Sequence, residues 1–281
     1  MPIESSSILL ADNGSLEPAA TLNLRAIAKR LGDALSRKVV PVSLFHSNAV
    51  PADLLHDQAA ELFTDALASR LQAGENDFLI VPLFFGSSGA LTDFLPSRVA
   101  ALKTKFPELR VRMAPPLVEV DAANDDRMAA ILEENVRAKI AEASGRPAMI
   151  LVDHGSPARA VTAVRDHLVG QLRARLGPAV CGVLAASMER RPETEYDFNE
   201  PLLERAFDRP GFDVGPVIVA TLFLSPGRHA GPGGDIARIC AAAQQRHPGL
   251  QIVMTDLVGR HPGLIPILVD RVRTGLISPP L

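Results

Sequence analysis

The stretch "MILVDHGS" at residues 149–156 is an apolar run that ends in polar and small residues. A second stretch, "ILLADNGS" at residues 8–15, repeats this pattern with asparagine in place of histidine. Short apolar runs bounded by turn residues are typical of strands buried in a parallel sheet. The repeat therefore predicts two equivalent strands, each followed by a tight turn that carries a polar side chain.

Three more blocks of the first half recur in the second half, in the same order and at a nearly constant offset. "VVPVSLFHS" (39–47) matches "GVLAASMER" (182–190), "FLIVPLFFGSSGAL" (78–91) matches "PVIVATLFLSPGRHA" (216–230), and "PPLVEVDAANDD" (115–126) lies where "DLVGRHPG" (256–263) does. Repeated order at a fixed period indicates a structural repeat. We therefore expect a tandem duplication with domains at residues 1–145 and 146–281.

Short apolar runs alternate with amphipathic segments along the whole chain. The runs predict strands at 7–11, 39–44, 78–85, 109–113, 148–152, 179–186, 216–224 and 250–255. Helical periodicity predicts helices at 17–35, 160–176 and 235–246, and another that begins at an Asn124 N-cap. Alternating strands and helices favour an α/β fold in which each domain is a small, mostly parallel sheet flanked by helices.

The composition excludes several classes of protein. The 281 residues are 47% hydrophobic and carry a net charge of −3, so no basic excess favours nucleic-acid binding. No apolar run reaches the length of a membrane span, and the N-terminus lacks a signal-peptide pattern, so we expect a cytoplasmic protein with no membrane partner. Cys181 and Cys240 form no Cys-x-x-Cys pair and are expected to be buried thiols.

Three ligand-type side chains follow three predicted strands of the second half. His154 follows the strand at 148–152, and Glu189 and His229 follow the next two strands along the chain. Ligands of open parallel sheets gather at the carboxyl ends of the strands, so we expect these side chains at one edge. Two imidazoles and one carboxylate suit a first-row divalent metal with open coordination positions.

The two halves differ in these residues. A lone histidine at a strand end is more often a turn residue than a ligand, so each position alone has a purely structural explanation. At the positions of His154 and His229, however, the first half carries Asn13 and Ala90 within a retained scaffold. His46, placed opposite Glu189, is the one ligand-type residue left. The simplest interpretation is one working half and one half without its ligands.

The phrases "VDHGSP" (152–157), "LFLSPGRHAGPGGDI" (222–236) and "GRHPGL" (259–264) resemble the small CbiX-type sirohydrochlorin chelatases of cobalamin and sirohaem synthesis. These class II chelatases are related in fold to protoporphyrin ferrochelatase. The resemblance covers the second half nearly end to end and the first half in degenerate form. It implies a tandem two-domain lyase that inserts Co²⁺, Fe²⁺ or Ni²⁺, as a substrate, into sirohydrochlorin or a related tetrapyrrole, without an organic cofactor.

The resemblance also implies which residues act. The metal-binding histidines of the family correspond to His154 and His229, and its acidic ligand to Glu189. Candidate substrate-binding residues beside them are Ser156, Arg190, Gly227 and Arg228, with Arg191 and Arg260 as further cations near the site. Arginine pairs well with the many carboxylates of such substrates, although a solvated surface position explains each arginine equally well. The turn 231–235, at a predicted helix start, is a further candidate for a substrate carboxylate.

Two alternatives remain at this point. A non-catalytic protein of the same fold would bind a tetrapyrrole or deliver a metal, and a metal-dependent hydrolase would use the same ligands. The partner in every case is a small molecule, and the duplicated chain is expected to act as a monomer or a homodimer.

Overall fold

The computed structural model describes residues 6–122 and 124–281, which form eight strands and eight α-helices. Contacts divide this chain into two compact units. Unit 1 comprises the described residues up to Glu119 together with Pro262–Leu281, and unit 2 comprises Val120–His261. Each unit holds one four-stranded sheet.

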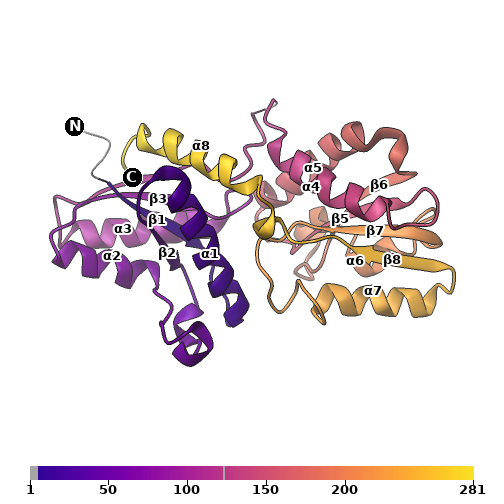
Figure 1. Ribbon diagram of the computed structural model, residues 1–281, viewed down its shortest axis with the longest axis horizontal. Coiled ribbons are helices and arrows are strands. Elements are labelled where there is room, and N and C mark those ends of the chain that lie inside the picture. Colours follow the sequence, from indigo (N-terminus) through magenta and orange to yellow (C-terminus); the bar gives the residue numbers. More distant parts are fainter. Residues whose placement is uncertain (1–5, 123) are drawn as a thin grey trace. The chain divides into compact units, whose positions relative to one another are not determined.

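Unit 1 is a parallel sheet covered by helices on both faces. Its strand order is β2-β1-β3-β4, with β1 at Ser7–Asp12, β2 at Val39–Ser43, β3 at Asp77–Pro82 and β4 at Arg110–Met113. Helices α1 (Pro18–Leu35) and α8 (Leu264–Leu276) pack together over one face, while α2 (Phe63–Gln72) and α3 (Leu95–Lys103) share a core with the other face (Figure 1).

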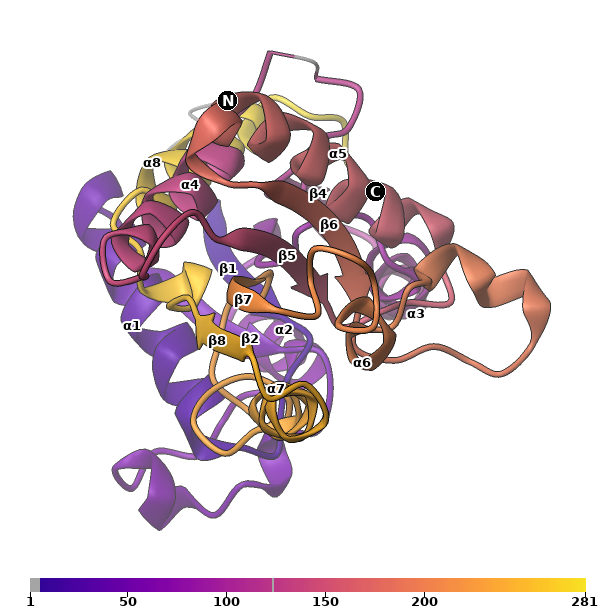
Figure 2. The ribbon, with the colours of Figure 1, turned by 90° about the vertical axis from the view of Figure 1, so that its right-hand side faces the viewer.

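Unit 2 repeats this architecture. Its strand order is β6-β5-β7-β8, all parallel, with β5 at Ala148–Asp153, β6 at Gly182–Ser187, β7 at Gly215–Thr221 and β8 at Leu250–Met254. Helices α4 (Arg127–Ile140) and α5 (Arg159–Leu176) cover one face, and α6 (Leu203–Ala206) and α7 (Asp235–Arg246) cover the other, as Figure 2 shows.

The apolar runs of the sequence form the central strands. All six residues of β5 are buried, because this strand has a neighbour on each side and helices on both faces. The predicted α/β class and all eight predicted strands are confirmed, with ends that differ by a few residues. The predicted Asn124 N-cap is wrong, because the helix begins after Asp126.

The last helix of each repeat packs in the unit that holds the other repeat. Helix α4 follows β4 in sequence but packs on α5 and β7, whereas α8 follows β8 but packs on α1 and β3. In Figure 1 the yellow α8 accordingly lies with the indigo strands and helix of unit 1. The predicted boundary between residues 145 and 146, placed where the sequence repeat restarts, stays a prediction. The compact units divide the chain elsewhere because of this exchange.

Short helical turns complete the chain. They are η2 (Ser47–Ala49), η3 (Ala52–Leu55), a π-helical turn η4 (Ala90–Phe94), η5 (Gly177–Ala179), η6 (Thr194–Asn199) and η7 (Val258–Arg260). Cys240 is buried as expected, whereas Cys181 is exposed because it lies just before β6. Within 6–122 and 124–281, no helix combines the length and apolar character needed to cross a membrane.

Candidate metal site of unit 2

Three predicted side chains meet at the carboxyl edge of the second sheet. The rings of His154 and His229 lie edge to face, with centroids 4.7 Å apart and planes inclined by 80°. His154 Nε2 lies 3.5 Å from Glu189 Oε1. The side chains of His154 and Glu189 are 46% and 59% exposed, and that of His229 is 26% exposed, so solutes reach all three. Their role as metal ligands stays a prediction.

Gly155 brings the His154 turn against Glu189. Its φ is +89°, and a Cβ added there would lie 1.9 Å from the Glu189 carbonyl oxygen. Only glycine tolerates both this backbone conformation and this close approach. The Glu189 N–H donates to the His154 carbonyl at 3.1 Å, so two of the candidate ligands are joined through the backbone.

A buried polar network lies directly beneath this turn. The Ser187 hydroxyl lies 2.5 Å from Asp153 Oδ1, and the Arg165 guanidinium donates to the same hydroxyl. Arg165 Nη1 is 3.8 Å from Asp153 Oδ1, and both side chains are almost fully buried. Burial raises the pKa of Asp153, and the charge of Arg165 opposes this rise. The network fixes the strand ends that carry His154 and Glu189.

Asn199 connects the same turn to η6. Its fully buried side chain accepts a hydrogen bond from the Ser156 N–H at 3.0 Å and donates to the Ser156 carbonyl at 3.0 Å. The Ser156 hydroxyl in turn accepts from the Ala158 N–H just before α5. Ser156, predicted to bind substrate, thus also holds the loop between β5 and α5.

The loop that carries His229 folds back onto the start of α7. The N–H groups of Asp235 and Ile236 donate to the carbonyls of Arg228 and His229, each at 3.1 Å. A Cβ on Gly234 would lie 2.9 Å from the His229 carbonyl oxygen, so glycine permits this packing. These N–H groups are satisfied by the backbone, so they are not donors for a substrate carboxylate, and a carboxylate contact elsewhere in the turn 231–235 stays a prediction. Gly227, another predicted substrate contact, closes the loop by donating to the Ala230 carbonyl.

Asp235 is a part of the site that the sequence motifs did not identify. Its Oδ2 lies 2.7 Å from His229 Nδ1. The hydrogen bond from His229, together with Arg238, lowers the pKa of Asp235, so the carboxylate is the acceptor. The Nδ1 proton then lies on the Asp235 side, and the Nε2 lone pair stays available. The spacing of an imidazole six residues before a helix-opening aspartate is the signal that could have indicated this pair.

The predicted arginines differ in what they contact. Arg190 Nε donates to Glu200 at 2.8 Å, and its Nη2 pairs with Asp197 at 3.1 Å, so this guanidinium is engaged within the protein. Arg191 lies over the Tyr196 ring, 5.3 Å from its centroid. Arg228 is 79% exposed, with Asp235 3.7 Å away. Arg228 is thus far more open to a solute than Arg190, whose side chain is 18% exposed.

Unit 1 has the same strand ends with different side chains. Asp12 pairs with Ser43 in register as Asp153 pairs with Ser187, and the Phe45 N–H donates to the Asn13 carbonyl as Glu189 does to His154. Phe45 is therefore the counterpart of Glu189, and the placement of His46 opposite Glu189 is wrong by one residue. Phe45 packs on Phe94 with centroids 4.4 Å apart.

Across residues 6–122 and 124–281, no three His, Cys, Asp or Glu side chains are arranged as a ready-made metal site. His154 lies next to both His229 and Glu189. For all three side chains to bind one ion, the exposed side chains of His154 and Glu189 must rotate. Such rotations between staggered conformers are common at exposed positions.

Comparison with known proteins gives one family and several structures. A family model named CbiX matches residues 7–139 and 148–275. No curated protein matches the sequence. SirB from Bacillus subtilis with Fe³⁺ has 16% sequence identity and a TM-score of 0.68, covering 97% of this chain and 96% of that one.

Two further structures are similar. The sirohydrochlorin chelatase SirB from Bacillus subtilis subspecies spizizenii in complex with cobalt has 14% identity and a TM-score of 0.69, covering 96% of this chain and 95% of that one. DR2241 from Deinococcus radiodurans, a multi-domain protein with structural similarity to chelatases, has 17% identity and a TM-score of 0.61, covering 96% of this chain and 55% of that one. At these identities the structures show a shared fold.

Proposed function

The chain belongs to the CbiX family, and we propose that it is a chelatase that inserts a divalent ion, Co²⁺ or Fe²⁺, into sirohydrochlorin or a related tetrapyrrole. The observation that carries this proposal is the meeting of His154, His229 and Glu189 at one sheet edge. The SirB structures of similar fold are described with Fe³⁺ and with cobalt, which agrees with a metal as substrate. Ni²⁺ suits the same ligand types.

The site has the chemistry that metal transfer needs. His154, His229 and Glu189 would hold the incoming ion through two nitrogen atoms and a carboxylate, which leaves coordination positions open for the pyrrole nitrogens. Because the protein would supply only three ligands, all of them exposed to solvent, the ion can be transferred to the macrocycle. Each insertion releases two pyrrole N–H protons for one divalent ion, and the imidazoles and the carboxylate vacated by the ion can accept them.

Asp235 supports His229 in this role. A carboxylate that accepts a hydrogen bond from the Nδ1–H group fixes the orientation of the ring and directs the Nε2 lone pair to the metal. His154 Nδ1 has a comparable partner in the Gly155 carbonyl, 3.0 Å away, which leaves its Nε2 facing Glu189. In both imidazoles, Nδ1 is thus engaged within the protein and Nε2 is available.

The decisive experiment is an anaerobic insertion assay with the full chain. Purified protein is mixed with sirohydrochlorin and Co²⁺ or Fe²⁺, and the absorption spectrum is followed against a protein-free control. A chelatase converts many macrocycles per chain, whereas a tetrapyrrole- or metal-binding protein saturates at one. Saturation at one equivalent, with no rate above the control, would overturn the proposal in favour of the binding protein.

A further inference from the structure

A cavity of about 360 Å³ lies beside the loop that carries His229. Thr221 and Met254, which line it, are the last residues of β7 and β8, and Pro226 and Pro232 reach it from either side of His229. The cavity therefore opens at the same carboxyl edge of the sheet as the candidate metal site, and all of its lining belongs to unit 2. Its volume is in the lower range of small-molecule pockets.

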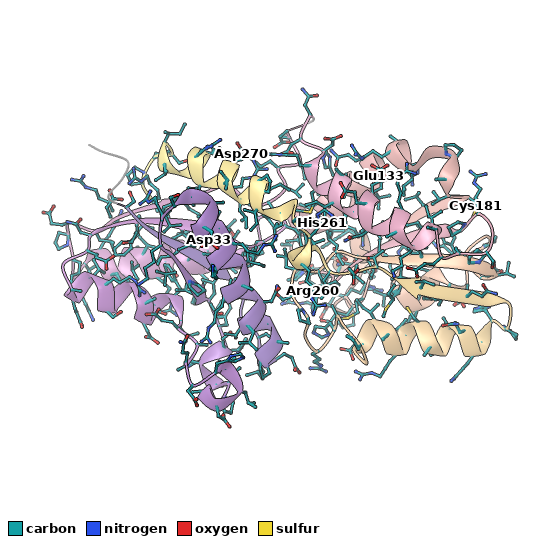
Figure 3. The ribbon with its side chains drawn as sticks, viewed as in Figure 1. Asp33, Glu133, Cys181, Arg260, His261 and Asp270 are labelled. Carbon is teal, nitrogen blue, oxygen red and sulfur yellow. The ribbon has the colours of Figure 1, made fainter. Side chains whose placement is uncertain are left out.

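The lining combines an apolar wall with one cation. Ile236, Met254 and Leu257 supply apolar surface, and Arg260 comes from η7, directly after β8 (Figure 3). Arg260 is exposed, and its guanidinium has no hydrogen-bond or ion-pair partner in the part of the chain that the structure describes. Arg190, by contrast, has its guanidinium engaged by Glu200 and Asp197.

We infer that this cavity binds one carboxylate-bearing edge of the tetrapyrrole, with Arg260 pairing the carboxylate and the apolar wall covering the adjoining methylene groups and ring edge. A guanidinium matches a carboxylate with two parallel hydrogen bonds, which fixes orientation as well as adding affinity. Because Pro226 and Pro232 belong to the His229 loop, a substrate edge seated here would lie next to the metal ligand. The inference rests on the proposed function and adds the residue that orients the substrate.

Asp256 makes it possible to test whether the ligand of this cavity is an anion or a cation. This exposed carboxylate also lines the cavity, and it is the other charged side chain there besides Arg260. A carboxylate ligand would be attracted by Arg260 and repelled by Asp256, so neutralising these two residues should change its affinity in opposite directions. A cationic ligand would give the reverse pair of signs, and an unused cavity would give no change.

The experiment measures equilibrium binding of metal-free sirohydrochlorin to the full chain by absorbance, and separately measures Co²⁺ binding. We expect Arg260→Gln to weaken tetrapyrrole binding by about 10- to 100-fold, the range for a charge-assisted pair, and Asp256→Asn to tighten it about 2- to 5-fold. Co²⁺ affinity should stay at the wild-type value in both variants. In the insertion assay, Arg260→Gln should raise KM with little change in kcat.

Arg173→Gln is the matched control, because it removes one positive charge from an exposed position in the last turn of α5. Unchanged tetrapyrrole affinity in Arg260→Gln, or an equal loss in Arg173→Gln, would overturn the carboxylate pocket while leaving the chelatase proposal intact. Wild-type protein that binds no tetrapyrrole would instead overturn the proposed function and the inference with it.

Discussion

The two units share one backbone device at the sheet edge and differ in what it carries. Gly14 has a φ of +87°, and an added Cβ would lie 1.8 Å from the Phe45 carbonyl oxygen. Gly155 has nearly the same values against Glu189. Around this turn, unit 1 presents Asn13 where unit 2 presents His154. The turn is therefore a requirement of the fold in both units, whereas the chemistry of each sheet edge depends on the side chains that the turn carries.

The surroundings of the two turns differ in polarity. In unit 1, Phe45 packs on Phe94, and Arg98 lies over the Phe94 ring at 4.9 Å. In unit 2, the counterpart of Phe45 is the exposed Glu189 beside His154. The packed rings of Phe45 and Phe94 stabilise unit 1 by contacting each other, whereas the exposed carboxylate of Glu189 is free to contact a solute.

The largest expected effect comes from removing a histidine of unit 2. His154→Ala and His229→Ala should each reduce metal insertion by at least about 100-fold, because each removes one of the two imidazoles that we propose as metal ligands. Asn13→Ala, at the equivalent position of unit 1, should leave the rate within about twofold. Initial insertion rates of the three variants check this. Normal turnover in either histidine variant would refute the site assignment.

Substituting Gly14 and Gly155 distinguishes an effect on stability from an effect on metal insertion. Gly155→Ala and Gly14→Ala introduce the same clash, so both should lower the free energy of unfolding by more than about 1 kcal/mol. Gly155→Ala should in addition reduce insertion on the order of 100-fold, because the displaced turn carries His154. Thermal unfolding and insertion rates are measured for both variants. Equal activity losses would show that the turn of unit 1 matters to the reaction as well.

Asp235 should have a smaller effect on the metal than its histidine. Asp235→Asn is expected to weaken Co²⁺ binding by about 10- to 100-fold, because a neutral amide orients the His229 ring less strongly. The matched control is Asp93→Asn in η4 of unit 1, whose carboxylate accepts a hydrogen bond from Thr92. Titration of the metal-free protein with Co²⁺ measures both affinities. An unchanged affinity in Asp235→Asn would limit this carboxylate to a structural role.

Replacing Asp12, the buried carboxyl of unit 1, should have the smallest effect on metal insertion, and its effect should appear in the stability of the protein. Burial raises the pKa of Asp12 from 3.8 to about 6. Folded Asp12 therefore holds its proton in a range where the unfolded chain has released it, and the free energy of unfolding falls as pH rises from about 4 to about 6. Asp12→Asn should remove this decrease, worth up to about 3 kcal/mol. Thermal unfolding between pH 4 and pH 7 measures it.

Asp153→Asn is the contrasting variant at the equivalent position. Arg165 lies 3.8 Å from Asp153, and unit 1 has Leu24 at the corresponding place in α1. The substitution removes the buried carboxylate beside Arg165 and leaves the half-exposed Asp166, 2.8 Å from the guanidinium, as its remaining carboxylate. It should therefore destabilise the protein at pH 7 by about 1–3 kcal/mol. Stabilisation by both Asp→Asn changes would show that Arg165 does not distinguish the two units.

Much of the fold could be predicted because its signals are local. The eight strands are short apolar runs bounded by turn residues, and burial on both faces of a parallel sheet demands such runs. The proximity of His154 and His229 could be predicted because strand ends of a parallel sheet share an edge. Glu189 joins this pair for the same reason, because it follows the next strand along the chain, whereas the difference between the halves points to the two histidines.

Other features depend on geometry that spacing does not encode. The register of β2 against β1 decides that Phe45, and not His46, corresponds to Glu189. The engagement of Arg190 by Glu200 depends on how the loop before α6 folds back. The pairing of Asp235 with His229 is not encoded in the spacing, because it forms only when the loop lies against α7.

The exchange of α4 and α8 makes the halves inseparable. A chain that stops at residue 145 would expose the part of the sheet that α8 covers, over β3 and β4, because α1 packs mainly on β1 and β2. It would also carry in α4 an apolar stripe (Met128, Ile131, Leu132 and Val136) with no surface to cover. Two such fragments could cover these surfaces by forming a dimer in which each α4 packs on the sheet of the other copy. The duplicated gene thus joins on one polypeptide what two half-length copies would otherwise have to find by encounter in solution.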